Sequence, residues 1–114
     1  MKQGIIIGAG IGGLTTAIAL AKKGIGATVY EQADAIKEVG AGIWVAPNGL
    51  KVYEKLGIVQ DIISAGKMLE KISVVDLNYK PISTVDGVKI RKKHKYSTLA
   101  VHRAALQKIL ASHF

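Results

Sequence analysis

A cluster of glycines near the N-terminus is the feature of this sequence that points most directly to chemistry. Residues 8–13 read Gly-Ala-Gly-Ile-Gly-Gly and fit the pattern G-x-G-x-x-G, with Gly8, Gly10 and Gly13 at its fixed positions. In such a pattern the first glycine permits a sharp turn, the second lets a pyrophosphate approach the backbone, and the third lets a helix lie close to a strand. The pattern therefore indicates a dinucleotide site. A Walker A loop is excluded, because no Gly-Lys-Ser or Gly-Lys-Thr ends the turn.

An acidic residue follows at a suitable distance from this turn. Glu31 stands eighteen residues after Gly13, where a carboxylate can accept hydrogen bonds from both hydroxyls of an adenosine ribose and repels a 2′-phosphate. The turn itself needs no lysine, because backbone amides and the positive end of a helix dipole supply the counter-charge. We therefore expect FAD or NAD rather than NADP. The alternative is a glycine-rich surface turn beside a solvated glutamate.

The elements that must position these residues follow from the hydrophobic pattern. Residues 3–7 end in three isoleucines, as expected of a strand buried on both faces in a parallel sheet. Apolar residues then recur at helical spacing from Ile11 to Ala21, and Gly24 ends the helix. Residues 27–31 predict the next strand. The opening of the chain thus predicts a βαβ unit and an α/β fold.

The remainder of the chain predicts shorter elements. A hairpin is predicted around Asn78-Tyr79-Lys80. Its antiparallel pairing would set it apart from the parallel sheet. At 114 residues we expect one domain or part of one. The predicted elements after residue 40 are an extended segment at 43–46, helices at 47–56 and 58–65, hairpin strands at 71–77 and 81–85, a strand at 97–102 and a helix at 103–111.

Composition excludes several classes of protein. With 49% hydrophobic and 21% charged residues the chain is expected to be globular. The absence of cysteine excludes a disulfide scaffold, a thiolate metal site and a cysteine nucleophile, and favours a cytoplasmic setting. His94, His102 and His113 have no acidic or thiol partner at metal-ligand spacing, so no metal is expected. Lys22 and Lys23 interrupt the longest apolar stretch, so no membrane span is predicted.

The net charge of +8 is concentrated near the C-terminus. Residues 80–114 carry eight basic side chains against Asp86 alone, and the densest run is Lys89 to Lys95. This run lacks the interleaved aromatic residues that stack on single-stranded bases. A solvated loop or strand is the favoured interpretation, and no nucleic-acid partner is expected. A basic nucleic-acid-binding module remains an alternative, for which salt-dependent retention on DNA would be the sign.

Beyond the glycine motif, nearly the whole chain resembles the N-terminal part of the FAD-dependent aromatic hydroxylases. These are the single-component flavoprotein monooxygenases typified by para-hydroxybenzoate hydroxylase and salicylate hydroxylase. The resemblance implies a Rossmann-like FAD-binding domain, NADH or NADPH as transient reductant, and hydroxylation of a small aromatic or polycyclic substrate through a flavin hydroperoxide. It is carried by Gly4 to Glu31, Gly40-Ala41-Gly42-Ile43, Ala46-Pro47-Asn48, Leu56-Gly57, Val101-His102-Arg103 and Leu106-Gln107.

The resemblance also implies roles for single residues. The glycine turn would hold the FAD pyrophosphate and Glu31 the adenosine ribose, while Val45 would lie close to the isoalloxazine. Arg103 and Gln107 match an Arg-x-x-Leu-Gln element whose arginine reaches the ribityl and pyrophosphate region. No catalytic residue is assigned. The expected cofactor-binding residues are Gly8, Gly10, Ile11, Gly12, Gly13, Glu31, Gln32, Gly42, Ile43, Val45, Arg103 and Gln107.

Two departures from the family are informative. Trp44 stands where a more polar residue is usual, and we predict that it packs in the core. Members of the family are also longer, so residues 1–114 are expected to be the N-terminal part of an FAD-binding domain, inactive alone, with 71–85 the first hairpin of a substrate domain. The alternative is an NAD-binding dehydrogenase domain, which predicts parallel strand-helix units continuing after residue 32.

Overall fold

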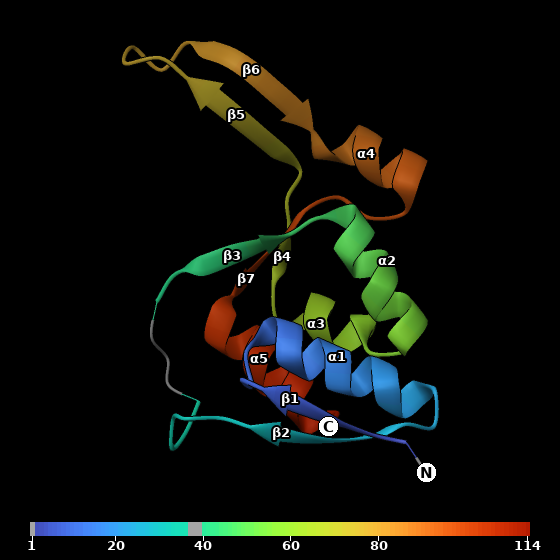
Figure 1. The fold of residues 1–114 in the computed structure, drawn as a ribbon. Helices are drawn as coiled ribbons and strands as arrows, with labels where there is room; N and C mark the ends of the chain where they lie inside the picture. The colour runs from blue at the N-terminus through green and yellow to red at the C-terminus, as the bar shows by residue number, and fades with distance from the viewer. Residues whose placement is uncertain (1, 37–39) are drawn as a thin grey trace.

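A computed structural model describes residues 2–36 and 40–114 of the chain. Figure 1 shows a body of small sheets and helices from which a hairpin and a short helix project. Among the described residues no helix has both the length and the apolar character needed to cross a membrane. The elements are β1 (Gln3–Ile7), α1 (Ile11–Lys22), β2 (Gly26–Tyr30), β3 (Gly42–Val45), α2 (Pro47–Leu56), α3 (Val59–Ser64), β4 (Lys67–Met68), β5 (Lys71–Val75), β6 (Pro81–Asp86), α4 (Gly87–His94), β7 (Leu99–His102) and α5 (Arg103–Ser112).

The predicted βαβ unit is confirmed. Strands β1 and β2 pair in parallel, with a register that runs from Gln3 opposite Gly26 to Ile7 opposite Tyr30. Helix α1 connects them and packs against both strands. At Gly13 this packing is so close that an added Cβ would lie 2.0 Å from the carbonyl oxygen of Gly8. Only a residue without a side chain therefore allows α1 to begin at this distance from the end of β1.

The expectation that residues 3–7 are buried on both faces is wrong. Alternate residues of a strand point to opposite faces of its sheet, and here Ile5 and Ile7 remain 72% and 82% exposed. Tyr30, opposite Ile7 on β2, is exposed on the same face. The physical reason is that α1 covers one face of the β1–β2 pair, whereas no described element packs extensively against the other.

A second sheet has the order β3-β7-β4 and is antiparallel. The dehydrogenase alternative required parallel units after residue 32, and this sheet does not fit it. Ile43 lies opposite Val101 and Val45 opposite Leu99, so these side chains share the face that is turned toward the helices. Trp44 consequently points the other way and is 64% exposed. The prediction that Trp44 packs in the core is therefore wrong. Side chains alternate between the two faces of a sheet, and Trp44 lies between Ile43 and Val45, which face the core.

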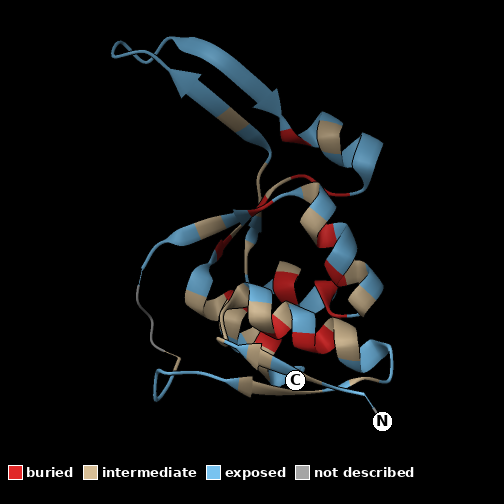
Figure 2. Ribbon diagram, in the orientation of Figure 1, coloured by how far each residue is buried: buried red, intermediate tan, exposed pale blue. Residues whose placement is uncertain are grey.

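The core lies between this second sheet and the helices. Figure 2 shows its buried residues gathered on the inner sides of α1, α2, α3 and α5. The largest fully buried apolar side chains are Leu50, Ile62, Leu99, Leu106 and Leu110. The helix predicted at 47–56 is confirmed as α2, and Gly57 ends it in a left-handed conformation with φ of 80°.

The hairpin and α4 form a projecting arm, residues 71–94 (Figure 1). The hairpin predicted around Asn78-Tyr79-Lys80 is confirmed as β5 and β6, which form a sheet of their own. Asp76 Oδ1 accepts hydrogen bonds from the amides of Asn78 and Lys80 and so stabilises the turn. Every residue of β6 is exposed.

The basic run is helical, so the loop or strand expected there is wrong. It forms α4, whose N-terminus is capped by Asp86: Oδ1 accepts from the amides of Val88 and Lys89. Asp86 is therefore the N-cap of α4. Basic side chains crowd the last turn of α4, where the helix dipole favours them. Lys95, just after this helix, forms an ion pair with Glu54 of α2.

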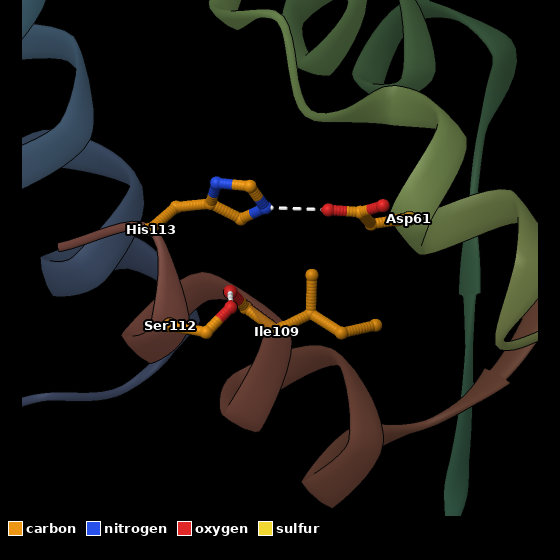
Figure 3. Close-up of polar contacts among 4 residues, drawn as sticks. All are labelled: Asp61, Ile109, Ser112 and His113. Carbon is orange, nitrogen blue, oxygen red and sulfur yellow. Dashed lines mark hydrogen bonds and ion pairs between the residues drawn. The ribbon is translucent and has the colours of Figure 1, made fainter.

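Helix α5 closes the body against α1 and α3. Its end is held by a contact between His113 Nε2 and Asp61 Oδ2 of α3, which are 2.7 Å apart (Figure 3). Ser112 Oγ donates to the carbonyl oxygen of Ile109, 2.6 Å away, within the last turn. The contact of His113 with Asp61 and the burial of Leu106 and Leu110 fix the position of α5, whereas the bond of Ser112 stabilises its last turn.

The contact at Gly13 leads to a stability prediction. We expect Gly13→Ala to lower the free energy of unfolding by about 1–3 kcal/mol, as overpacking does, because the new methyl group meets backbone at Gly8. Gly12→Ala is the matched control, since a Cβ there meets nothing within 4 Å and alanine favours a helix over glycine by about 1 kcal/mol. Urea unfolding monitored by circular dichroism measures both. Equal midpoints for the two variants would contradict the proposed contact.

Candidate functional site

The glycine turn exposes unpaired backbone amides at the start of α1. Gly8 has a φ of 104°, and its amide donates to the carbonyl oxygen of Tyr30 on β2, 2.7 Å away. Leu14 is the first residue whose amide donates within the helix, to Gly10 O. The amides of residues 10–13 have no hydrogen-bond partner among the described residues, and no acidic side chain lies in the first turn. Such a helix end attracts anions.

The space beside Gly10 and Gly12 is open. A Cβ added at Gly10 or Gly12 would meet no atom within 4 Å. Glycine at these positions is therefore not required by packing, in contrast to Gly13. A ligand can reach the backbone there without a side chain in the way, which is the property that the motif predicted.

Glu31 follows β2 directly and faces the turn. Its Oε2 accepts a hydrogen bond from the amide of Ala9 at 2.7 Å, and its Oε1 accepts one from the amide of Ala33 at 3.2 Å. The bond from Ala9, and then that from Ala33, hold the pKa of Glu31 below its usual range. The carboxylate is therefore charged at neutral pH. It is also exposed, so its remaining lone pairs are accessible to a ligand.

Helix α5 brings two further predicted residues to the same place. Arg103 begins the helix, and Gln107 lies one turn later on the same side. The Nε2 atom of Gln107 donates to the carbonyl oxygen of Ala9, 2.7 Å away. Ninety-eight positions of sequence separate these two residues. The contact thus joins the C-terminal helix to the N-terminal turn.

One groove of about 650 Å³ is lined by Glu31, Arg103 and Gln107 together with Ala9 and Gly10 of the turn. A neighbouring hollow of about 340 Å³ shares Arg103 and Ala104 with it and reaches Gly40, just before β3. An elongated ligand could extend from Glu31 past Arg103 toward β3 through the two hollows. The residues that line the groove are Ala9, Gly10, Glu31, Gln32, Ala33, Asp34, Ala35, Ile36, Arg103, Ala104 and Gln107.

The predicted residues on β3 do not line this groove. Gly42 borders a hollow on the outer side of the second sheet, with Lys67 and His102. Ile43 and Val45 border an apolar hollow of about 350 Å³ that also includes Ile11 of α1. Val45 is only 8% exposed, so a ligand at this position of β3 would meet mainly backbone.

Ala9, Ala33 and Ala104 are residues of the site that the sequence did not single out. Ala9 and Ala33 contribute backbone groups, which every residue type possesses, and Ala104 lines both hollows. The only signal for Ala9 is its place between the first two glycines of the motif. The basic run, by contrast, lies on α4 and contributes nothing to the lining of the groove. Among the described residues, no three His, Asp or Glu side chains gather as metal ligands would.

The hydrogen bonds of Glu31 lead to a pH prediction. Because its folded-state pKa is lowered, its contribution to stability is present above the ordinary glutamate pKa of about 4.3 and is lost as the pH falls through the lower folded value. We therefore expect the difference in unfolding free energy between wild type and Glu31→Gln to shrink between about pH 6 and about pH 3. Urea titrations across this range measure it. A difference that stays constant would show that the ionised carboxylate does not stabilise the turn.

Known proteins are similar to this chain in sequence and in fold. The whole chain, residues 1–114, matches the family described as FAD binding domain. Aurachin C monooxygenase/isomerase of Stigmatella aurantiaca is 32% identical over 113 residues, which are 96% of this chain and 30% of that protein. The 3-hydroxybenzoate 6-hydroxylase 1 of Aquipseudomonas alcaligenes is 35% identical over 108 residues, 93% of this chain and 27% of that protein.

A solved structure agrees with the sequence relatives. The crystal structure of Klebsiella pneumoniae HpxO complexed with FAD and uric acid has a TM-score of 0.79 and 33% identity, over 98% of this chain and 28% of that chain. The present chain thus spans less than a third of each of these proteins. The resemblance to FAD-dependent aromatic hydroxylases and the FAD cofactor are confirmed, and the chain belongs to the FAD binding domain family.

Proposed function

We propose that this chain forms the part of an FAD site that holds the pyrophosphate and the adenosine ribose. The protein that contains it would hydroxylate a small aromatic compound, with NADH or NADPH as reductant. The observation that carries the proposal is the common groove, in which Gly10 at the start of α1, Glu31 and Arg103 face the same space. An anion-binding backbone, a hydroxyl acceptor and a guanidinium together match the successive groups of a dinucleotide.

The residues of the groove fit the chemistry of FAD. The unpaired amides before and within the first turn of α1 are donors for phosphate oxygens, and the helix dipole adds a partial positive charge. Arg103 offers a planar set of donors that can span two phosphate oxygens. Glu31 is held as a charged acceptor by the backbone amides of Ala9 and Ala33, and the remaining lone pairs of its carboxylate can accept from the ribose hydroxyls.

Glu31 also provides selectivity. Its lowered pKa keeps the carboxylate negative at neutral pH. A negative carboxylate that accepts from the ribose hydroxyls would repel a phosphate on the 2′ position. NADPH would therefore not be accepted in this groove as a resident cofactor. The transient reductant would use another part of the protein, so this selectivity leaves open which of NADH and NADPH it is.

Strand β3 would serve the flavin end of the cofactor. It is an edge strand of its sheet, so the backbone groups on its outer side lack strand partners. Gly42, Ile43 and Val45 would therefore act mainly through main-chain atoms, because the side chain of Val45 is in the core. When bound, FAD supplies the electron storage and the reactivity toward dioxygen that amino-acid side chains lack.

The substrate and the cellular setting are inferred for the protein as a whole. Relatives of this chain include a 3-hydroxybenzoate 6-hydroxylase and a protein crystallised with uric acid, both of which point to planar rings. We infer that the hairpin of the arm contributes to a larger, substrate-binding sheet, because β5 and β6 stand apart from the other sheets and β6 is wholly exposed. We also infer a cytoplasmic location, since a chain without cysteine suits a reducing compartment.

Ligand binding to this chain tests the proposed cofactor site. We expect FAD and ADP to bind, and Glu31→Ala to weaken both about tenfold to a hundredfold, the loss typical of hydrogen bonds to a charged acceptor. Gln60→Ala, at an exposed position on α3, is the matched control and should bind as wild type does. Isothermal titration calorimetry measures all three proteins. No detectable affinity of the wild-type chain for either ligand would refute the proposed site.

The activity is tested in the full-length protein that includes this segment. We expect purification to yield a yellow protein with a flavin absorption spectrum, and NADH or NADPH consumption that requires dioxygen and is stimulated by an aromatic substrate. Spectrophotometry and an oxygen electrode measure these properties. A colourless protein that added FAD does not alter would argue against the monooxygenase proposal.

A further inference from the structure

The peptide groups on both sides of Ala9 are held by side chains from different parts of the chain. The Ala9 amide donates to Glu31 Oε2, and the Ala9 carbonyl oxygen accepts from Gln107 Nε2, each at 2.7 Å. The preceding amide, of Gly8, donates to the carbonyl oxygen of Tyr30. Three backbone groups of Gly8 and Ala9 are thus held by hydrogen bonds within the protein. The part of the turn that precedes α1 therefore has its geometry set before any ligand arrives.

The bond from Gln107 determines the orientation of one peptide plane. The carbonyl of Ala9 and the amide of Gly10 belong to the same trans peptide unit, in which C=O and N–H point in opposite directions. Holding the Ala9 oxygen on Gln107 therefore aims the Gly10 N–H away from Gln107. Gly10 lines the groove, and its amide has no partner among the described residues. If this peptide flipped, a carbonyl oxygen would replace the amide and repel a phosphate.

Gln107 is well placed to hold this bond. A carbonyl can only accept, so the side chain must present its NH2 group to Ala9. Its neighbours Leu106 and Leu110 on α5 are fully buried, which fixes the helix and leaves the glutamine little freedom to move. Arg103, on the same side of α5, is exposed and unconstrained by such a bond to the turn.

We propose that Gln107 is a positioning residue, which orients the Ala9–Gly10 peptide so that the Gly10 amide faces the cofactor pyrophosphate. This inference rests on the proposed FAD site and gives Gln107 a role different from the direct cofactor contact that the resemblance implies. Gln107 lines the same groove, so direct contact is the rival explanation, and the experiment must separate the two.

The first measurement uses the wild-type chain. In protein labelled with ¹⁵N and ¹³C, we expect a scalar coupling across the hydrogen bond between Gln107 Nε2 and the Ala9 carbonyl carbon. It should be present in the free protein and persist when ADP saturates the site. If ADP abolishes the coupling, the glutamine leaves Ala9 for the ligand, and the positioning role is overturned. This result does not depend on whether a variant folds.

The second measurement compares variants. Gln107→Met keeps the length of the side chain and removes the donor, and we expect ADP binding about threefold to tenfold weaker, the range of one net hydrogen bond. Gln107→Glu should weaken it further, because a carboxylate facing a carbonyl repels it. Adenosine, which has no phosphate, should bind to both variants as to wild type. The amide resonance of Gly10 should shift in both variants before any ligand is added. Gln60→Met is the control.

The outcomes separate the two proposals. If wild type binds neither ADP nor FAD, the proposed cofactor site fails and this inference fails with it. If wild type binds ADP and Gln107→Met binds it equally well, only the positioning role is overturned. The same holds if Gln107→Met loses ADP affinity while the Gly10 resonance of the free protein stays unchanged, because the loss would then come from a direct contact.

Discussion

The site depends on the close contact between the first turn of α1 and the end of β1. At Gly13 the helix approaches the carbonyl of Gly8 more closely than any side chain would permit. This contact places Gly10, just before α1, at the wall of the groove and brings the turn within reach of Glu31, which follows the adjacent strand. The proposed anion site therefore consists of backbone, and Gly13 is needed for the close approach of α1 to the end of β1.

Helix α5 completes what the βαβ unit begins. It lies against α1 because its leucines enter the common core, and the same helix extends Gln107 to Ala9 and Arg103 to the groove. Packing and site formation are thus linked, since a displacement of α5 would release the turn and remove the guanidinium together. The antiparallel sheet of β3, β7 and β4 serves the same end by fixing the start of α5, which follows β7 without a loop.

Among the residues that the structure describes, no buried ion pair arranges the charges of the site. Glu31 is held by the amides of Ala9 and Ala33, so its negative charge is stabilised by backbone dipoles while it stays exposed to the groove. The basic run plays no part there, because it lies on α4 of the arm and does not line the groove. Local geometry, rather than net charge, is what makes the groove suited to a dinucleotide.

The amino-acid sequence by itself determined the elements whose signals are local. The glycine pattern and Glu31 indicated the βαβ unit and the class of cofactor, and Pro47 and Gly57 marked the ends of α2. Tertiary structure decided which faces are covered: Ile5 and Ile7 are exposed and Trp44 points outward, because burial depends on elements far away in the chain. It also decided the bond of Gln107 to Ala9, which periodicity cannot reveal, since a backbone carbonyl has no residue type and the two partners meet only when α5 packs on α1.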